Sequence, residues 1–125
     1  MKEKISILIV EDEFLAALVL KRNLKLLGYE VCELVATGEE AIESAAKEKP
    51  DIILMDIRLA GEMDGIEAAQ EISSRYQVSI IFTTGYSDQD FMEQVNKLNP
   101  VACLIKPVHI PDLVSAINLV LDKNE

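Results

Sequence analysis

The chain has 125 residues, of which 50% are hydrophobic and 27% are charged, and its formal net charge is −10 at pH 7. This length and composition are typical of a single globular domain with an apolar core, spanning residues 1–125. The acidic balance argues against direct binding to nucleic acid, which proteins hold through Lys and Arg. No apolar run approaches the roughly 20 residues that cross a bilayer, so no membrane association is expected. The amino terminus lacks signal-peptide features, and Cys32 and Cys103 lie in strand-like runs, so a cytoplasmic location is expected.

Strand-like and helix-like segments alternate five times along the chain. The apolar run 5–10 predicts a first strand, and residues 13–27 predict a helix that ends at Gly28. Residues 29–36 are strand-like but are interrupted by two glutamates, which is typical of an edge strand.

The same alternation continues into the middle of the chain. Thr37 is expected to cap a second helix that ends near Lys47, with Glu40 in capping-box spacing. Residues 51–55 predict the third strand, and a glycine-containing loop separates that strand from a third helix over 66–75.

Two more units complete the sequence. Residues 79–84 predict a fourth strand, and a short helix is expected to begin at Ser87-Asp88. Residues 101–105 predict the fifth strand, and the apolar spacing from Ile110 to Leu121 predicts an amphipathic last helix.

Continuous apolar strands that alternate with helices indicate a parallel sheet covered on both faces. The sequence therefore predicts an α/β domain with one doubly wound five-stranded parallel sheet, strand order 2-1-3-4-5, and five helices on both faces. In that order the chain reverses direction between the first and third strands. A ligand site is expected at the carboxyl ends of those two strands.

Four of the predicted strands run directly into reactive polar residues: Glu11-Asp12, Asp56, Thr84 and Lys106. Because the carboxyl ends of parallel strands meet at one edge of the sheet, these side chains should converge there. Three carboxylates about 4 Å apart repel by roughly 4 kcal/mol per pair at an effective dielectric of about 20, so a cation should offset them. Oxygen ligands that are open to solvent suit Mg²⁺.

The same set of residues suits phosphoryl chemistry. Asp56 is the natural nucleophile, because a carboxylate can form an aspartyl phosphate. Phosphoryl transfer needs positioning and neutralisation of the charge on the phosphoryl oxygens, which the metal ion and Lys106 can supply. The Thr84 hydroxyl is expected to bond to one phosphoryl oxygen, whereas Thr83 alternates with it and should serve the structure of the strand.

Five segments, in order and with the right spacing, strongly resemble the receiver domain of two-component response regulators, including chemotaxis regulators. They are 7–13, 54–59, 63–68, 82–86 and 104–107. The resemblance implies a flavodoxin-like fold and a phosphorylation-activated signalling switch. Such a protein is not an enzyme beyond its own phosphotransfer and autodephosphorylation.

The resemblance also implies a role for each site residue. Asp56 is the expected phosphoacceptor, and the expected Mg²⁺ ligands are Asp12, Asp56 and the backbone carbonyl of Arg58, with Glu11 acting through a metal-bound water. Thr84 is the expected switch hydroxyl and Lys106 the phosphate-contacting lysine, followed by a cis peptide bond to Pro107.

The resemblance also implies one partner upstream and one downstream of this protein. A sensor histidine kinase or phosphotransfer protein is expected to donate the phosphoryl group. A downstream protein, or a second copy of the chain, is expected to bind the face formed by the fourth helix, the fifth strand and the fifth helix.

One position departs from the family pattern. Receiver domains usually carry Tyr or Phe three residues before the lysine, and here that position is Cys103. The phosphorylation chemistry is unaffected, but the usual aromatic readout is missing. Tyr86 and Phe91 are the alternative aromatic residues near this site.

Three other functions fit parts of the pattern. A haloacid-dehalogenase-like phosphatase needs a second Asp two residues after the nucleophile, and that position is Arg58. A flavin-binding module needs a first loop that binds a phosphate group through backbone amides and hydroxyls, and Glu11-Asp12-Glu13 would repel one. A degenerate receiver that signals without phosphate is disfavoured by the complete set of matching residues.

Overall fold

The computed structural model describes residues 4–85 and 90–123, in which five strands alternate with five helices. The strands are β1 (Ser6–Val10), β2 (Glu30–Val35), β3 (Ile52–Asp56), β4 (Ser79–Thr84) and β5 (Ala102–Ile105). The helices are α1 (Phe14–Leu26), α2 (Gly38–Glu48), α3 (Gly65–Arg75), α4 (Met92–Lys97) and α5 (Ile110–Lys123). All four strand pairings are parallel, and the order across the sheet is β2-β1-β3-β4-β5. The predicted α/β architecture and strand order are confirmed, with β2 at an edge.

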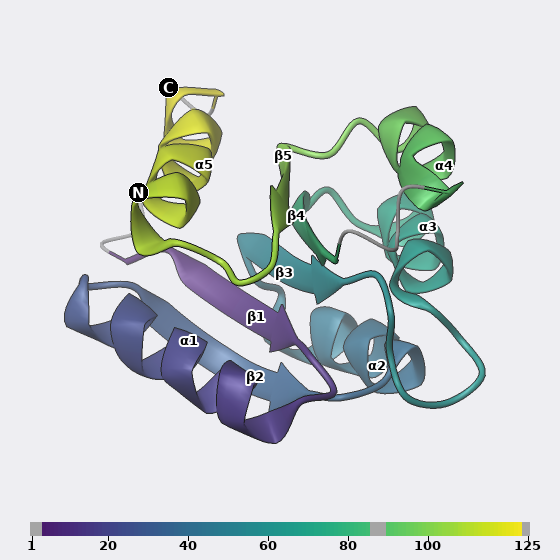
Figure 1. Cartoon of the computed structure of the whole chain (residues 1–125), viewed down its shortest axis with the longest axis horizontal. Coiled ribbons are helices and arrows are strands. Elements are labelled where there is room, and N and C mark those ends of the chain that lie inside the picture. Colours follow the sequence, from purple (N-terminus) through teal and green to yellow (C-terminus); the bar gives the residue numbers. More distant parts are fainter. Residues whose placement is uncertain (1–3, 86–89, 124–125) are drawn as a thin grey trace.

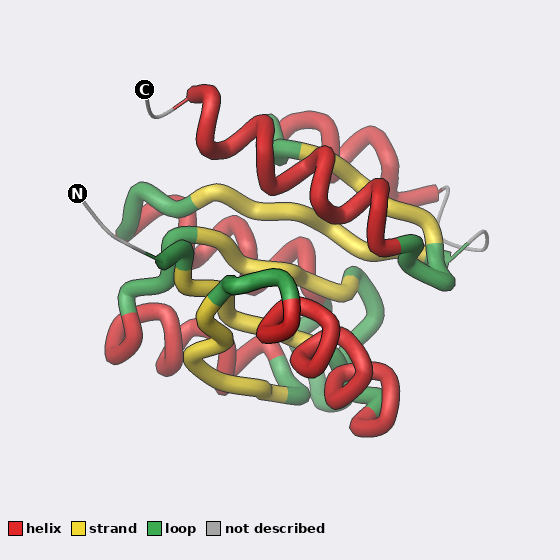
Figure 2. Tube along the Cα trace, turned by 90° about the vertical axis from the view of Figure 1, so that its left-hand side faces the viewer, coloured by secondary structure: helices red, strands yellow, loops and turns green. Residues whose placement is uncertain are grey.

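The helices form two layers around the sheet. In Figure 1, α1 and α5 lie on one side of the sheet, and α2, α3 and α4 lie on the other. Figure 2 shows the same arrangement from the side, with the strands stacked between helical layers. Both faces of the sheet are therefore covered, as continuous apolar strands require.

Two apolar clusters fill the spaces between these layers. Alternate strand residues point to opposite faces, so Ile7 and Ile9 of β1 pack toward α1 and α5, whereas Leu8 and Val10 pack toward the α2 side. The central strands are buried along their whole length, which fixes the register that brings their carboxyl ends together.

Two helix starts are fixed by side-chain caps. The Glu40 amide donates to the Thr37 hydroxyl oxygen at 3.1 Å, as predicted, but the Glu40 carboxylate accepts from the amide of Ala36 rather than from that of Thr37. The complete capping box lies at α3, where Asp64 and Glu67 accept from each other's backbone amides at 2.8 and 3.0 Å. Such caps typically stabilise a helix by about 1 kcal/mol.

The predicted element ends agree with the structure to within one or two residues where they can be compared. Gly28 follows α1 with a φ of 96°, the left-handed conformation that favours glycine. Helix α4 begins at Met92, and the predicted start at Ser87-Asp88 lies outside the described residues. None of the helices in residues 4–85 and 90–123 is long and apolar enough to span a membrane.

Candidate functional site

The strand register brings the predicted site residues to one edge of the sheet. Val10 of β1 pairs with Met55 of β3, so Glu11 and Asp56 follow neighbouring positions on adjacent strands. On the next strand, Thr84 follows Thr83, which pairs with Asp56. The amide of Lys106 donates to the Thr84 carbonyl at 2.7 Å, which places the lysine at the end of β5 beside β4.

Lys106 connects two of the three carboxylates. Its ammonium nitrogen lies 2.5 Å from Asp56 Oδ2 and 2.9 Å from Glu11 Oε1. Both carboxylates are buried, with 3% of Asp56 and 6% of Glu11 exposed. Hydrogen bonds between charged groups at these distances are among the stronger polar contacts in proteins, so the lysine is held over Asp56.

The third carboxylate, Asp12, completes an acidic cluster. One carboxylate oxygen from each of Glu11, Asp12 and Asp56 lies within 4.8 Å of the other two. Asp12 is exposed, so the cluster is open to solvent on one side. This donor set, all oxygen and partly open to water, fits a hard divalent cation such as Mg²⁺.

Burial and mutual repulsion shift the proton equilibria of the cluster. Burial, together with the adjacent Glu11 carboxylate, raises the pKa of Asp56 to about 7, although the bond from Lys106 acts in the opposite direction. Burial and Glu11 also raise the pKa of Asp12. Burial alone would raise the pKa of Glu11, but its contacts with Lys106, Asp56 and the Glu13 amide lower it overall.

The contacts of Lys106 favour its charged form. Burial acts to lower the pKa of Lys106, but its bonds to Asp56 and Glu11 raise it above the ordinary value. Lys106 is therefore a permanent cation at neutral pH, and the cluster holds more negative charge than one lysine neutralises.

A comparison with known proteins shows which family the chain belongs to. A model of the response regulator receiver domain matches residues 7–118. The chain belongs to the response regulator receiver domain family. The resemblance predicted from five short segments is therefore confirmed over almost the whole chain.

Individual relatives agree with this assignment. The transcriptional regulatory protein PdtaR of Mycobacterium tuberculosis (strain ATCC 25618 / H37Rv) is 38% identical over 117 residues, which cover 94% of this chain and 57% of PdtaR. Sporulation initiation phosphotransferase F of Bacillus subtilis (strain 168) is 30% identical over 118 residues, which cover 94% of this chain and 92% of that protein. The chain thus spans a little over half of PdtaR and nearly all of the second relative.

A solved structure has the same fold. The signal receiver domain of a modulated diguanylate cyclase from Desulfovibrio desulfuricans G20 superimposes with a TM-score of 0.90 and 37% sequence identity. The match covers 97% of this chain and 96% of that one.

Other predicted features of the receiver domain lie around the cluster. The peptide bond between Lys106 and Pro107 is cis, as predicted. The Thr84 side chain is buried, and its hydroxyl donates to the Gly85 carbonyl at 3.2 Å. The backbone amide of Arg58 donates to Asp56 Oδ1 at 3.2 Å, whereas Lys106 contacts Oδ2. The loop after β3 and the lysine therefore hold different oxygens of the same carboxylate.

Gly65 is a residue whose role the sequence pattern did not reveal. Its amide donates to the Ile57 carbonyl at 2.7 Å, which brings the start of α3 against the end of β3. A Cβ atom at position 65 would collide with the backbone carbonyl of Asp56. Only glycine therefore allows α3 to pack this closely behind the predicted phosphoacceptor.

The Arg58 side chain and Phe91 form a contact that the sequence pattern also did not reveal. The guanidinium carbon lies over the Phe91 ring, 5.6 Å from the ring centroid. Cys103 is partly buried and packs against the same apolar cluster as Phe91. Tyr86, the other predicted aromatic candidate, lies outside the described residues.

Helix α1 presents an apolar surface beside the cluster. Of the eight large hydrophobic side chains that are exposed in the described part of the chain, six lie on α1 or at its end: Phe14, Leu15, Leu18, Val19, Leu26 and Leu27. The helix contains Lys21, Arg22 and Lys25 and no acidic residue, in a chain with a net charge of −10. A groove of about 490 Å³ between α1 and the start of α5 adjoins this surface, and Thr83 and Lys106 line it.

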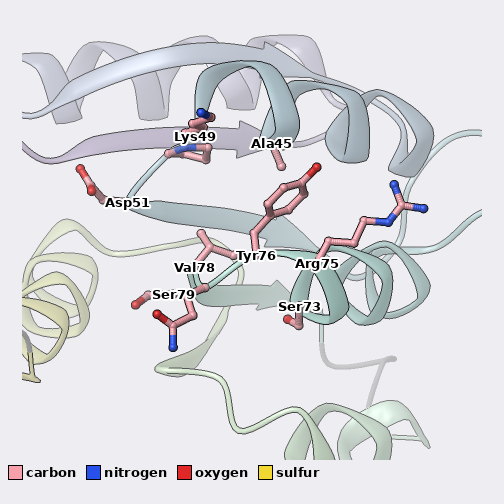
Figure 3. A pocket seen from close by; sticks show the side chains of 10 residues that line it. Ala45, Lys49, Asp51, Ser73, Arg75, Tyr76, Val78 and Ser79 are labelled. Carbon is pink, nitrogen blue, oxygen red and sulfur yellow. The ribbon is translucent and has the colours of Figure 1, made fainter.

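A larger groove lies at the opposite ends of the strands. It has a volume of about 1020 Å³ and is lined by residues from the ends of α2 and α3 and the starts of β3 and β4. Figure 3 shows Tyr76 directed toward α2, with Lys49 and Asp51 at one side. Asp51 accepts hydrogen bonds from the amide and hydroxyl of Ser6, at 2.9 and 3.2 Å, which joins the starts of β1 and β3. This groove is remote from the acidic cluster, and none of the predicted site residues lines it.

Proposed function

We propose that this receiver domain is a phosphorylation-activated signalling switch that accepts a phosphoryl group on Asp56. The observation that supports the proposal best is the position of Asp56 between a cation and two further carboxylates. Its carboxylate contacts Lys106 on one oxygen and the Arg58 amide on the other, at the end of a fully buried strand. A nucleophile held in this way is preorganised for attack on phosphorus.

The transfer consists of one bond exchange. An Asp56 carboxylate oxygen attacks the phosphorus of the donor and forms an acyl phosphate bond, while the bond between phosphorus and the donor's leaving atom breaks. The electron pair of the broken bond goes to the leaving group. Lys106 lies where it can balance the negative charge of the phosphoryl oxygens, and the Thr84 hydroxyl can donate to one of them.

Mg²⁺ fits the cluster as the required cation. Asp12 and Asp56 would hold it with the Arg58 carbonyl, and Glu11 would act through a metal-bound water. The ion supplies charge neutralisation for the phosphoryl oxygens, as metal ions do in other phosphoryl transfers. The presence of three carboxylate oxygens within 4.8 Å of one another supports this donor set.

The phosphoryl donor is proposed to be a sensor histidine kinase or a phosphotransfer protein. The exposed apolar residues of α1, with Lys21, Arg22 and Lys25, offer a docking surface on the helix that begins two residues after Asp12. Leu15→Glu and Val19→Glu should slow transfer from a phosphorylated kinase but leave labelling by acetyl phosphate unchanged. Leu119→Glu on α5 is the matched control, because Leu119 is 54% exposed and lies outside α1.

We propose that the partner that responds to phosphorylation binds the face formed by α4, β5 and α5. This partner is a downstream protein or a second copy of the chain. Ile105 and Leu119 are exposed apolar residues of β5 and α5, whereas Met92, Val108 and Ile110 are half-buried. Phosphorylation would shift an existing equilibrium between two conformations of this face.

Labelling by a small phosphodonor tests the proposed function. Wild-type protein and Asp56→Asn are incubated with acetyl phosphate, with Mg²⁺ or with EDTA, and their intact masses are measured. We expect one phosphoryl group on the wild type in the presence of Mg²⁺ only, and none on Asp56→Asn. Equal labelling of the two proteins would rule out Asp56 as the acceptor.

A further inference from the structure

We propose that Arg58 couples the state of Asp56 to α4: its guanidinium rests on Phe91 in the unphosphorylated protein and moves to the phosphoryl group when Asp56 is modified. This inference rests on the proposed function and adds a route by which the site reaches a distant surface. It assigns a side-chain role to a residue whose backbone alone figures in the proposed metal site.

The position of Arg58 connects the two regions. Its backbone amide donates to Asp56 Oδ1 at 3.2 Å, and its side chain lies over Phe91, 5.6 Å from the ring centroid. Phe91 is the residue immediately before α4 and marks its amino-terminal end. One residue therefore contacts both the predicted phosphoacceptor and the start of α4.

The charge balance of the site favours the move. Lys106 is already shared between Asp56 and Glu11, at 2.5 and 2.9 Å. An aspartyl phosphate carries close to two negative charges where the carboxylate carried at most one, and it offers three strong acceptor oxygens. A guanidinium that binds phosphate oxygens makes charge-assisted hydrogen bonds, which are stronger than a cation–π contact near the protein surface. Arg58 is therefore expected to exchange the ring for the phosphoryl group.

Loss of the contact between Arg58 and Phe91 should weaken the packing of α4. Phe91 is half-buried and packs at the edge of the apolar cluster that also holds Val95, the buried residue of α4. Helix α4 spans only Met92–Lys97, and Phe91 provides no side-chain cap, so the helix depends on packing. Without the guanidinium above it, the Phe91 ring can change its packing and α4 can loosen.

Hydrogen exchange of residues 90–98 tests the coupling directly. Exchange is measured by mass spectrometry with Mg²⁺ alone and with Mg²⁺ plus beryllofluoride, a stand-in for the phosphoryl group, and fluorine NMR verifies that beryllofluoride is bound. In wild type we expect beryllofluoride to speed exchange in this segment by about fivefold, the factor expected from loss of one cation–π contact.

Variants separate the coupling from the binding step. Arg58→Gln and Phe91→Leu each remove the contact, so both should exchange fast without beryllofluoride and respond little to it. Arg58→Lys keeps the positive charge and should restore part of the response. Arg75→Gln is the matched control, because Arg75 pairs with Glu71 on α3, and it should respond like wild type.

The outcomes distinguish this inference from the proposed function. A wild-type response in Arg58→Gln or Phe91→Leu, or unchanged α4 exchange in wild type with beryllofluoride bound, would overturn the coupling alone. Failure of acetyl phosphate to label wild-type Asp56 would overturn the proposed function and this inference with it.

Discussion

The ammonium of Lys106 lies 2.5 Å from the Asp56 carboxylate, across the ends of β5 and β3. These strands are separated by β4 in the sheet, so the contact spans a neighbouring strand. The lysine is thus the cation nearest to the predicted phosphoacceptor in the described part of the structure. Its charge lowers the pKa of Asp56 against the stronger effect of burial.

Removing the Lys106 charge should therefore change the pH dependence of labelling. Without the lysine, burial and Glu11 act on Asp56 unopposed, and its pKa rises above about 7. In Lys106→Gln, labelling by acetyl phosphate should be slower, and the pH at which the labelling rate is half-maximal should be higher than in wild type. Initial rates between pH 6 and 9 measure this, with Lys106→Arg as the charge-preserving control. A slower rate with an unshifted profile would contradict the electrostatic role.

Metal binding should stabilise the fold through Asp12. A ligand that binds only the native state at ten times its Kd adds about 1.4 kcal/mol to the free energy of unfolding. Asp12→Ala should abolish this gain, and without metal it should be more stable than wild type because the burial and the repulsion by Glu11 that raise the Asp12 pKa are relieved. Thermal melts with Mg²⁺ and with EDTA measure both effects. Glu62→Ala is the control, because Glu62 is an exposed carboxylate outside the cluster. Equal Mg²⁺-dependent shifts of the melting temperature in wild type and Asp12→Ala would count against the metal site.

The raised pKa of Asp56 should make metal-free stability depend on pH. Between its ordinary pKa of 3.8 and about 7, the folded protein holds a proton on Asp56 that the unfolded chain has lost. The free energy of unfolding contributed by Asp56 therefore falls as pH rises through this window and is constant above it. Relative to wild type, Asp56→Asn should gain stability from pH 4 to 7, with each pKa unit worth about 1.4 kcal/mol. Urea unfolding in EDTA measures the difference, and a constant difference would refute the raised pKa.

Gly65 should be required for the position of Asp56. In Gly65→Ala the added methyl group would collide with the Asp56 carbonyl, and overpacking of this kind typically costs about 1–3 kcal/mol. Labelling of Asp56 should slow as well, because the end of β3 must shift. Gly28→Ala is the matched control: its φ of 96° makes alanine unfavourable by about 1–2 kcal/mol, but nothing lies within 4 Å. If both variants lost stability equally and labelled normally, the close packing would have no role at the site.

The sequence predicts the framework of the protein well, for physical reasons visible in particular residues. Continuous apolar strands such as 52–55 require helices on both faces, and the topology then places Glu11, Asp56 and Lys106 at one edge. These are rules of pattern and connectivity, which a single sequence displays. The roles assigned to Thr84, the Arg58 carbonyl and Mg²⁺ remain predictions.

The contacts that the sequence did not predict depend on the three-dimensional approach of separate segments. The close packing at Gly65 depends on the distance between α3 and β3, and the contact between Arg58 and Phe91 joins the loop after β3 to the start of α4. The sequence indicated Phe91 as an alternative aromatic residue, but it did not predict the contact of Phe91 with Arg58. The exposed face of α1 was not predicted either, because apolar residues on a helix normally indicate a buried face.

Chemical trapping of the phosphorylated residue tests the central claim most directly. Borohydride reduces an acyl phosphate on aspartate to the alcohol, homoserine, and releases phosphate, whereas a phosphate ester on Ser or Thr is not reduced. Protein treated with acetyl phosphate and Mg²⁺ is reduced, digested and sequenced by mass spectrometry. We predict homoserine at position 56 and at no other aspartate, and none when Mg²⁺ is replaced by EDTA. Homoserine at Asp12 or another aspartate, or an unmodified Asp56 in labelled protein, would contradict the account.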